Sequence, residues 1–353
     1  MSNPKIIAFY LPQYHTIPEN DKWWGEGFTE WTNTTKSKPL FKGHQQPKTP
    51  LNDNYYCLLD KETQEWQAKL AQENGVYGFC YYHYWFNGKM LLEKPMELML
   101  ENKDITLPFC ISWANEPWAR TWDGKDKEVL MLQEYGDKKE WKEHFNYLLK
   151  FFKDKRYIKV DNKPVFLIYR TSNIPNCEEM VNYWDELCKD NGFDGIYLVE
   201  TINSFQKLSC IQNSSAVVEF EPMLTIRHYL PLYKQGLRYI KKKLSILDKL
   251  EYEYIWNRVI NKNVDYGKTK YLGGFVSWDN TARKGKKGLV LTDFSCEKFE
   301  KKLSEQISKS SDNNSEFLFI NAWNEWAEGT YLEPDTENKF NYLSKLKKII
   351  DIL

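Results

Sequence analysis

Two kinds of hydrophobic pattern alternate along the chain. Short apolar runs rich in β-branched and aromatic residues predict strands, and longer stretches with apolar residues three and four positions apart predict helices. Strands are expected at residues 5–10, 76–82, 107–113, 164–169, 195–200, 216–220, 273–278 and 316–323. Helices are expected at residues 61–74, 138–153, 178–191, 297–308 and 341–353.

Alternating strands and helices imply parallel strands joined by crossover helices. Eight such units predict a single (β/α)8 TIM barrel, an α/β fold that commonly needs a chain of about this length. The 353 residues include only 17 Gly and 14 Pro, so a flexible hinge between domains is not expected. Residues 1–353 are therefore expected to form one barrel domain.

Two long segments interrupt the alternation. Residues 15–60, after the first strand, are too aromatic for a disordered linker and are expected to fold over the barrel mouth. Residues 227–270, between the sixth and seventh strands, hold eleven basic and four acidic residues. The simpler interpretation is a solvated helical insertion, and the alternative is peripheral contact with an anionic lipid surface or a phosphate-bearing substrate.

Charge and targeting signals narrow the class of protein. Lys plus Arg and Asp plus Glu both number 49, so no global positive field favours nucleic acid. The longest apolar run, residues 6–11, is too short for a transmembrane segment. The first residues lack the pattern of a cleavable signal, and the seven cysteines are scattered without a paired motif, so a cytoplasmic protein with reduced thiols is expected.

Aromatic residues are unusually frequent, with 14 Trp, 23 Tyr and 19 Phe making 16% of the chain. Sugar rings present apolar faces edged with hydroxyls, so aromatic platforms with interspersed polar groups suit a glycan. In a barrel the site lies at the C-terminal strand ends, where aromatic and polar residues of this chain gather. Aromatic residues there could merely plug the barrel, but a barrel needs no Glu, His or Asn at that end for its stability. The candidate glycan-binding residues are Tyr10, Gln13, His15, Trp24, Glu30, Trp31, Tyr82, His83, Trp85, Trp113, Asn115, Glu116, Trp122, Glu219, Trp278, Asp279, Trp323, Asn324 and Tyr331.

Glu325 and Glu328 are the leading catalytic candidates. Glycoside cleavage normally uses one carboxyl group as an acid and a second that handles the developing charge or activates a nucleophile. If the chain turns helically after the last strand, residues three apart lie on one side, and repulsion between them raises the pKa of one. The alternative is that both residues merely favour a helix N-terminus through its dipole.

Glu116 is a second candidate acid. Asn115-Glu116-Pro117 resembles the acid/base segment that follows the fourth strand of many retaining barrel glycosidases, but here it follows the third expected strand. Glu116 is therefore interpreted as a substrate-binding or alternative acid residue.

No metal and no cofactor are expected. His15 and His83 lie on different strands without a partner at metal-ligand spacing. The chain also lacks the glycine-rich phosphate-binding motifs and the esterase nucleophile motif.

Six segments in order resemble the WbsX group, whose members are described as glycosyltransferases of surface-polysaccharide loci and as glycoside hydrolase family 99-like proteins. They are FYLPQYH (9–15), NDKWWGEGFTEWTN (20–33), GFCYYHYWFNGK (78–89), WANEPWARTWDG (113–124), SWDNTAR (277–283) and NAWNEWAEGTYLEPD (321–335). The related family 99 enzymes are retaining endo-acting α-mannosidases and mannanases on a (β/α)8 barrel.

The resemblance implies roles for the carboxylates. Glu325 would take a proton from the sugar 2-hydroxyl, so that the 2-oxygen attacks the anomeric carbon and forms a 1,2-anhydro sugar. Glu328 would protonate the leaving oxygen and later deprotonate the incoming water or sugar. Ala327 stands where the family 99 hydrolases usually have His, which leaves the choice between α-mannosides and α-rhamnosides open.

The leading hypothesis is a retaining hydrolase or transglycosylase acting on an oligosaccharide or polysaccharide in bacterial surface-polysaccharide metabolism. The first alternative is a sugar-nucleotide-dependent glycosyltransferase, although the chain has no Asp-x-Asp to hold a metal–diphosphate donor. The second is a non-catalytic glycan-binding barrel, against which Glu325 and Glu328 speak.

Overall fold

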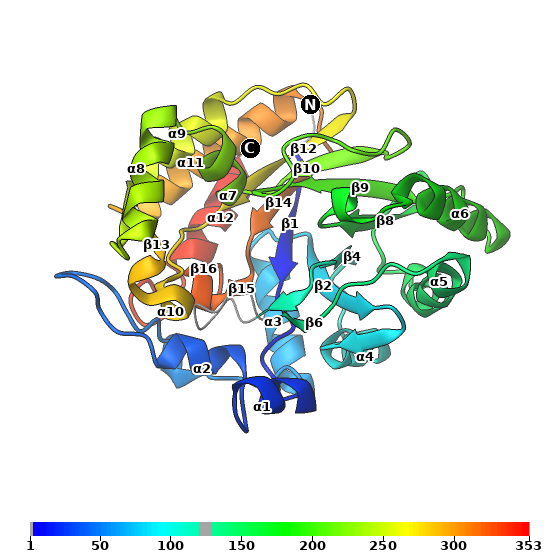
Figure 1. Ribbon diagram of the computed structural model, residues 1–353, viewed down its shortest axis with the longest axis horizontal. Coiled ribbons are helices and arrows are strands. Elements are labelled where there is room, and N and C mark those ends of the chain that lie inside the picture. The colour runs from blue at the N-terminus through cyan, green and yellow to red at the C-terminus, as the bar shows by residue number, and fades with distance from the viewer. Residues whose placement is uncertain (1–2, 120–128, 353) are drawn as a thin grey trace.

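The computed structural model describes residues 3–119 and 129–352, and its centre is a closed barrel of eight parallel strands (Figure 1). In barrel order the strands are β1 (Lys5–Tyr10), β2 (Gly78–Phe86), β4 (Phe109–Trp113), β8 (Lys163–Ile168), β9 (Tyr197–Ile202), β10 (Ala216–Glu219), β12 (Thr269–Phe275) and β14 (Phe317–Asn321). Strand β1 pairs with both β2 and β14, which closes the ring. The predicted (β/α)8 fold is confirmed, and Trp122 lies outside the described residues.

Amphipathic helices surround the barrel and bury their apolar faces against it. The larger ones are α3 (Lys61–Glu73), α4 (Lys94–Glu101), α5 (Lys138–Phe152), α6 (Cys177–Asp190), α9 (Tyr252–Asn261), α11 (Cys296–Asp312) and α12 (Asn341–Ile352). Each expected helix is present with slightly different ends. None of the helices within residues 3–119 and 129–352 is long and apolar enough to span a bilayer.

Smaller elements decorate the barrel. These are β3 (Lys89–Leu91), β5 (Trp118–Ala119), β6 (Val129–Met131), β7 (Lys159–Val160), β11 (Asp248–Glu251), β13 (Leu289–Thr292), β15 (Asn324–Glu325), β16 (Thr330–Tyr331), η2 (Thr171–Asn173), η3 (Gly285–Lys287), η4 (Trp326–Glu328) and α10 (Thr281–Lys284). Several of them lie in the loops that follow barrel strands, where a barrel builds its site.

Aromatic side chains fill the barrel. The Phe9 ring lies 5.0 Å from Phe220, 5.6 Å from Phe319 and 5.7 Å from Tyr82, so side chains from three strands and from the residue after β10 meet in one layer. Such layers make the barrel a packed core and leave space for ligands only beyond the strand ends.

The long segment after β1 folds into α1 (Pro18–Trp24), α2 (Glu30–Thr35) and η1 (Leu51–Asp53). A capping box between Thr29 and Thr32 begins α2, which buries Glu30 and Trp31. Helix α2 packs on η4 and α10, which follow β14 and β12. The segment therefore covers the C-terminal end of the barrel, as the sequence predicts.

The basic segment 227–270 is a helical insertion. It contains the end of α7 (Met223–His228), α8 (Leu232–Lys243), β11 and α9. Helix α9 buries Tyr252, Ile255, Trp256 and Val259, whereas α8 has no buried residue.

Candidate active site

A cavity of about 530 Å³ opens at the C-terminal ends of the barrel strands. It is lined by aromatic rings and by three carboxylates, two guanidinium groups and one amine. The lining residues are Leu11, Gln13, Trp24, Tyr82, Tyr84, Ala114, Glu116, Pro117, Trp118, Ala119, Leu130, Tyr169, Arg170, Ser204, Phe205, Phe220, Met223, Trp278, Asn280, Arg283, Lys284, Glu325 and Glu328. Apolar walls with a few converging polar groups are typical of a site for a small ligand.

Glu325 and Glu328 both face this cavity because the chain turns directly after β14. Strand β15 ends at Glu325, and the single 3-10 turn η4 covers Trp326 to Glu328. In a 3-10 turn, residues three apart lie above one another, which brings the two carboxylates to the same side. The helical turn on which the sequence analysis made their pairing conditional is therefore present.

Arg283 connects three carboxylates. Its Nη2 donates to Glu325 Oε2 at 3.1 Å, its Nη1 to Glu328 Oε1 at 2.6 Å, and its Nε to Glu30 Oε1 at 2.9 Å. Glu30 comes from α2 and is fully buried, while the Glu328 side chain stays 22% exposed towards the cavity. A guanidinium presents its donors in a rigid fork, so this contact fixes the positions of all three carboxyl groups.

Burial dominates the protonation of Glu325. It raises the pKa of Glu325 to about 8, with further raising by Glu328 and Glu30 and partial lowering by Arg283. Three carboxylates around one cation leave excess negative charge, so retention of a proton on Glu325 relieves the repulsion. The protonated form of Glu325 is therefore favoured at neutral pH.

Glu116 lies across the cavity in a second ion pair. Its Oε1 is 3.0 Å from Nη1 of Arg170, whose guanidinium stacks 3.6 Å from the centre of the Phe205 ring. Burial raises the pKa of Glu116, Arg170 lowers it, and Glu328 raises it. Strand β4 is the third barrel strand, so Glu116 follows strand three, as the sequence predicts.

The predicted binding residues on β2 point alternately to the two sides of the strand, so some face the cavity and others face α5. Tyr82 lines the cavity, as does Tyr84. His83 points outward, where its Nε2 is 2.9 Å from Nε2 of His144 on α5, and burial lowers its pKa to about 3. Trp85 also points outward and stacks on His144 with ring centroids 4.5 Å apart. His83 and Trp85 therefore hold α5 on the barrel and do not reach the cavity.

Three further residues that the sequence analysis assigned to the binding site are instead packed between structural elements outside the cavity. Tyr10 donates from its hydroxyl to Gln67 on α3 at 2.7 Å. Trp113 donates from its indole to the carbonyl of Trp85 at 3.2 Å. Trp31 donates from its indole to the carbonyl of Tyr56 at 2.9 Å. Each of these three side chains is buried between elements and lies outside the cavity lining.

The side chains of Asn115 and Asn324 form hydrogen bonds with the backbone of neighbouring loops. The Asn115 amide exchanges hydrogen bonds with the backbone of Arg170 at 2.8 and 2.9 Å. The Asn324 amide does the same with Leu11, at 2.7 and 3.0 Å. Both residues position cavity-lining neighbours and lie outside the lining themselves.

Asp279 holds the loop that carries Arg283. It accepts hydrogen bonds from Gln46 at 2.7 Å and Thr281 at 2.6 Å, and lies 2.8 Å from His44. Burial would raise the pKa of Asp279, but the hydrogen bonds of His44 and Thr281 outweigh burial, and the pKa lies below its ordinary value. Asp279 is therefore a buried anion beneath the site.

Four remaining predicted residues also lie outside the cavity lining. Glu219 pairs with Lys262 at 3.0 Å. Tyr331 donates to Asp335 at 2.8 Å. Trp323 packs on Phe79, with ring centroids 4.9 Å apart. His15 is buried in the loop after β1, where burial lowers its pKa to about 4, so its ring is neutral at pH 7.

Gln13, Trp24 and Trp278 line the cavity as predicted. The sequence analysis did not select Arg283, Tyr84, Tyr169, Arg170 or Phe205, which also line it. Arg283 belongs to the segment SWDNTAR, so its proximity to the aromatic strand end was the available signal. Phe205 carried no such signal, because it lies in a loop after β9 with no distinctive motif.

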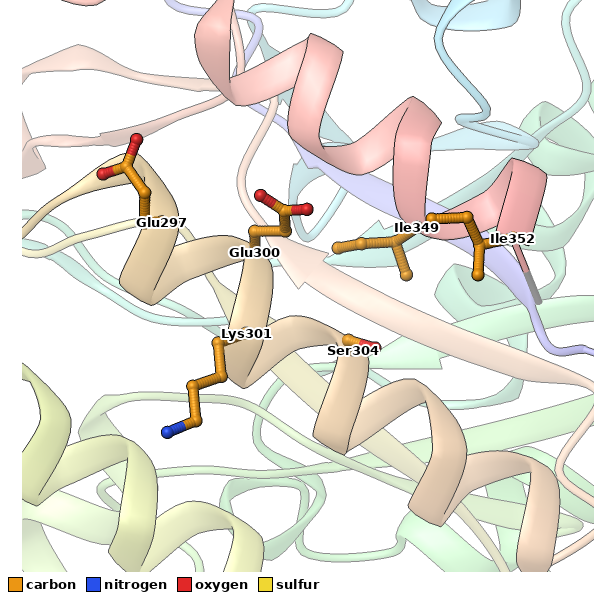
Figure 2. A pocket seen from close by; sticks show the side chains of 6 residues that line it. All are labelled: Glu297, Glu300, Lys301, Ser304, Ile349 and Ile352. Carbon is orange, nitrogen blue, oxygen red and sulfur yellow. The ribbon is translucent and has the colours of Figure 1, made fainter.

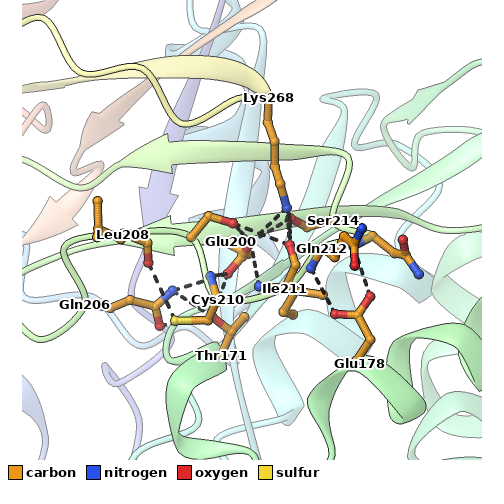
Figure 3. Close-up of polar contacts among 12 residues, drawn as sticks. Thr171, Glu178, Glu200, Gln206, Leu208, Cys210, Ile211, Gln212, Ser214 and Lys268 are labelled. Carbon is orange, nitrogen blue, oxygen red and sulfur yellow. Dashed lines mark hydrogen bonds and ion pairs between the residues drawn. The ribbon is translucent and has the colours of Figure 1, made fainter.

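A buried carboxylate explains how the loop after β9 places Phe205 at the cavity. Glu200 on β9 accepts hydrogen bonds from Thr171 at 2.9 Å, Ser214 at 2.6 Å and the backbone amide of Cys210 at 2.9 Å (Figure 3). Burial would raise the pKa of Glu200, but these donors together with Ser209 lower it. The contacts tie residues 203–215 to the barrel, and the same loop places Ser204 and Phe205 at the cavity.

A shallow hollow between α11 and α12 is a weaker candidate (Figure 2). Its carboxylate Glu300 is bound by Lys345 and Lys348, each at 2.6 Å. Ile349 and Ile352 form the other side, and no aromatic platform lines the hollow. The chemistry of the described residues therefore concentrates in the barrel cavity.

Comparison with known proteins identifies the family of this chain. The family model described as glycosyltransferase WbsX matches residues 6–346. WxcX of Xanthomonas campestris pv. campestris, an uncharacterized protein, is 35% identical over 350 residues, covering 98% of this chain and 49% of WxcX. The chain thus spans about half the length of the curated relatives it matches.

Solved structures show the same fold. The family 99 endo-α-mannosidase of Bacteroides thetaiotaomicron matches with a TM-score of 0.55 at 13% identity, covering 98% of this chain and 96% of that chain. A glycoside hydrolase-like protein matches with a TM-score of 0.59 at 12% identity, covering 99% and 94%.

Proposed function

Since the chain belongs to the WbsX glycosyltransferase family, a family of carbohydrate-active enzymes, we propose that it is a retaining hydrolase or transglycosylase of α-linked glycans. The observation that carries the proposal is the attachment of Glu325 and Glu328, on one wall of the cavity, to the single guanidinium of Arg283. The aromatic rings of Tyr82, Tyr169 and Trp278 supply faces on which sugar rings can stack.

The proposed reaction has two balanced steps. In the first, Glu325 takes the proton of the sugar 2-hydroxyl, the 2-oxygen bonds to the anomeric carbon, and the glycosidic bond breaks as Glu328 gives its proton to the leaving oxygen. In the second, Glu328 takes a proton from water or a sugar hydroxyl as that oxygen bonds to the anomeric carbon. The bond between the anomeric carbon and the 2-oxygen breaks in the same step, and Glu325 returns its proton to the 2-oxygen. A 2-hydroxyl trans to the leaving group is required, which α-mannosides and α-rhamnosides provide.

The raised pKa of Glu325 affects the choice of which carboxylate is the base and which is the acid. A base must be ionised before it acts, and the raised pKa of about 8 keeps Glu325 protonated at neutral pH. Under the roles given above, Glu325 must lose this proton before it can act as the base. The reversed assignment, with Glu325 as the acid and Glu328 as the base, needs no such loss.

Leaving-group chemistry distinguishes the two assignments. A 2,4-dinitrophenyl α-mannoside or α-rhamnoside departs without protonation, so loss of the acid spares its cleavage while loss of the base does not. Glu328→Gln should therefore lose turnover of an oligosaccharide by at least about 100-fold and keep the release of dinitrophenol in the first step, while the second step slows because Glu328 is also its base. Glu325→Gln should lose both, and Glu297→Gln on α11 is the matched control. The opposite pattern would reverse the roles.

The 2-oxygen is tested separately. A 2-O-methyl glycoside should bind in the cavity and resist cleavage, because its 2-oxygen has no proton to give. Cleavage of the methylated glycoside at the rate of the parent would exclude the anhydro intermediate. Transfer from a sugar nucleotide together with inertness towards every α-glycan would favour the glycosyltransferase alternative, for which Lys284 at the cavity is the supporting cation.

A further inference from the structure

Helix α8 turns its apolar side chains away from the protein. Tyr233, Leu237, Ile240 and Leu244 follow helical spacing along one stripe, and they are 65%, 54%, 53% and 64% exposed. In a surface helix this stripe normally faces the core. Figure 1 shows α8 at the outer edge of the molecule, with α9 and α11 between it and the barrel.

The polar side of α8 makes the contacts with the protein instead. Arg238 donates to Asp248 on β11 at 2.6 Å and to the carbonyl of Ile226 at 2.9 Å. Lys241 reaches Asp248 at 3.3 Å, and Gln235 donates to the carbonyl of Leu230 at 2.7 Å. These bonds fix the rotation of the helix, so the outward direction of the apolar stripe is built into the fold.

All charged residues within the segment that carries the stripe are basic. Residues 229–247 contain Lys234, Arg238, Lys241, Lys242 and Lys243 and no acidic residue. By helical spacing Lys241 and Lys243 lie on either side of the stripe. Lys242 and Lys243 are exposed.

We infer that α8 is a docking surface for an anionic lipid membrane. An apolar stripe flanked by lysines and carrying tyrosines is the pattern with which a helix lies in the headgroup region, with apolar residues in the acyl boundary and cations on lipid phosphates. A protein partner would need acidic groups matched to these lysines, whereas an anionic bilayer supplies negative charge over its whole surface. The inference goes beyond the proposed function and does not depend on which bond the cavity cleaves.

The docking surface is connected to the catalytic end of the barrel. Helix α8 is bonded to β11 through Asp248, and β11 pairs in parallel with β13 from Leu289 to Thr292. Strand β13 in turn bonds to the residue that precedes α10, the helix of Arg283, since the backbone amide of Asn280 donates to the backbone carbonyl of Leu289 at 3.2 Å. A membrane bound at α8 would therefore hold the cavity at a set orientation to glycans attached to that membrane.

Vesicle sedimentation tests the inference with the intact chain. Phosphatidylcholine vesicles with about one-third phosphatidylglycerol should bind the protein at low salt, and vesicles of phosphatidylcholine alone should bind it far less. Raising the salt to about 0.5 M should weaken binding, because the Debye length falls to a few ångströms.

Two double variants separate the apolar and charged contributions. Leu237→Glu with Ile240→Glu should lower binding by at least about 100-fold, since two apolar anchors are lost and two negative charges are added. Lys242→Gln with Lys243→Gln should lower it about fivefold or more, chiefly through Lys243 beside the stripe. The matched controls are Leu59→Glu and the pair Lys153→Gln and Lys155→Gln, which should bind like the parent. Leu59 is 42% exposed, and Lys153 and Lys155 lie beyond the end of α5, which Figure 1 shows on the other side of the molecule from α8.

The vesicle experiments either support or overturn membrane docking by α8. Unchanged thermal unfolding of the variants together with the expected binding order supports membrane docking. Absence of binding to anionic vesicles, or equal binding by the Leu237→Glu and Ile240→Glu variant, overturns it. A concentration-dependent dimer that this variant disrupts, with no vesicle binding, would show that the stripe is instead an interface between two copies. Hydrolysis of a soluble glycan should be unaffected by these variants, so failure here leaves the proposed chemistry standing.

Discussion

Arg283 Nη1 donates a hydrogen bond to Glu328 Oε1 at 2.6 Å, which joins the short helix after β12 to the turn after β14. The same guanidinium reaches Glu325, so the positions of both carboxylates after β14 depend on one side chain that follows the neighbouring strand β12. Because Arg283 also lowers the pKa of Glu325 against its burial, this contact sets protonation as well as geometry.

Substitution Arg283→Lys keeps a positive charge and removes the fork. We expect kcat/KM on a cleaved glycan to fall by about 100-fold, because the carboxylates are no longer held in one geometry. The more drastic Arg283→Met should also lower the free energy of unfolding by about 3–5 kcal/mol, since it leaves buried carboxylates unpaired. Arg258→Lys on α9 is the matched control and should change neither quantity. Full activity of Arg283→Lys would show that the fork is dispensable.

The raised pKa of Glu325 predicts a pH dependence of stability. The folded protein binds this proton up to pH about 8, whereas the unfolded chain releases it near pH 4.5. Between these values the folded state holds more protons, so the contribution of Glu325 to stability is fully present below pH 4.5 and is lost as pH rises through about 8. Glu325→Gln should therefore gain stability relative to the parent at pH 8 compared with pH 5, by about 2 kcal/mol or more. Denaturant titrations at both pH values measure this, and an equal difference at both would contradict the assignment.

Neighbouring residues on β2 should behave in opposite ways. Tyr82→Ala removes a cavity wall, so we expect glycan affinity to fall by about tenfold or more. His83→Gln disturbs the buried contact with His144, so it should lower the melting temperature and leave glycan affinity unchanged. Calorimetric binding and thermal unfolding of both variants check the pair. A loss of affinity in His83→Gln with unchanged stability would return His83 to the binding site.

The close approach of β12 to β10 predicts a sharp contrast between two glycines. A Cβ on Gly273 would lie 1.8 Å from the carbonyl oxygen of Glu219, whereas one on Gly274 would meet its nearest atom, in the Leu303 side chain, at 3.3 Å. Gly273→Ala should therefore lower the free energy of unfolding by about 3 kcal/mol or more, and Gly274→Ala by about 1 kcal/mol or less. Urea unfolding measures both, and equal effects would contradict the strand spacing.

Much of the fold could be predicted because it depends on local patterns. Strand and helix periodicity are properties of neighbouring residues, and eight alternations allow few arrangements other than a closed barrel. The turn at Glu325 and Glu328 was stated from the sequence only as a condition, which the 3-10 turn η4 meets.

The membership of the cavity was harder to predict. The sequence analysis assigned Tyr82, His83 and Trp85 alike to the binding site. A strand directs alternate residues to opposite sides, and only the packing of α5 on β2 decides which residues face the helix and which face the cavity. The same reason moved Trp113 into the layer beneath the helices.

The sequence by itself determined the barrel, the segment that covers it and the pair of carboxylates, because each follows from residues close together in the chain. Tertiary structure alone decided that Arg283 joins Glu30, Glu325 and Glu328, and that the apolar stripe of α8 faces outward. Both depend on how distant segments pack, and burial created by that packing places the proton on Glu325.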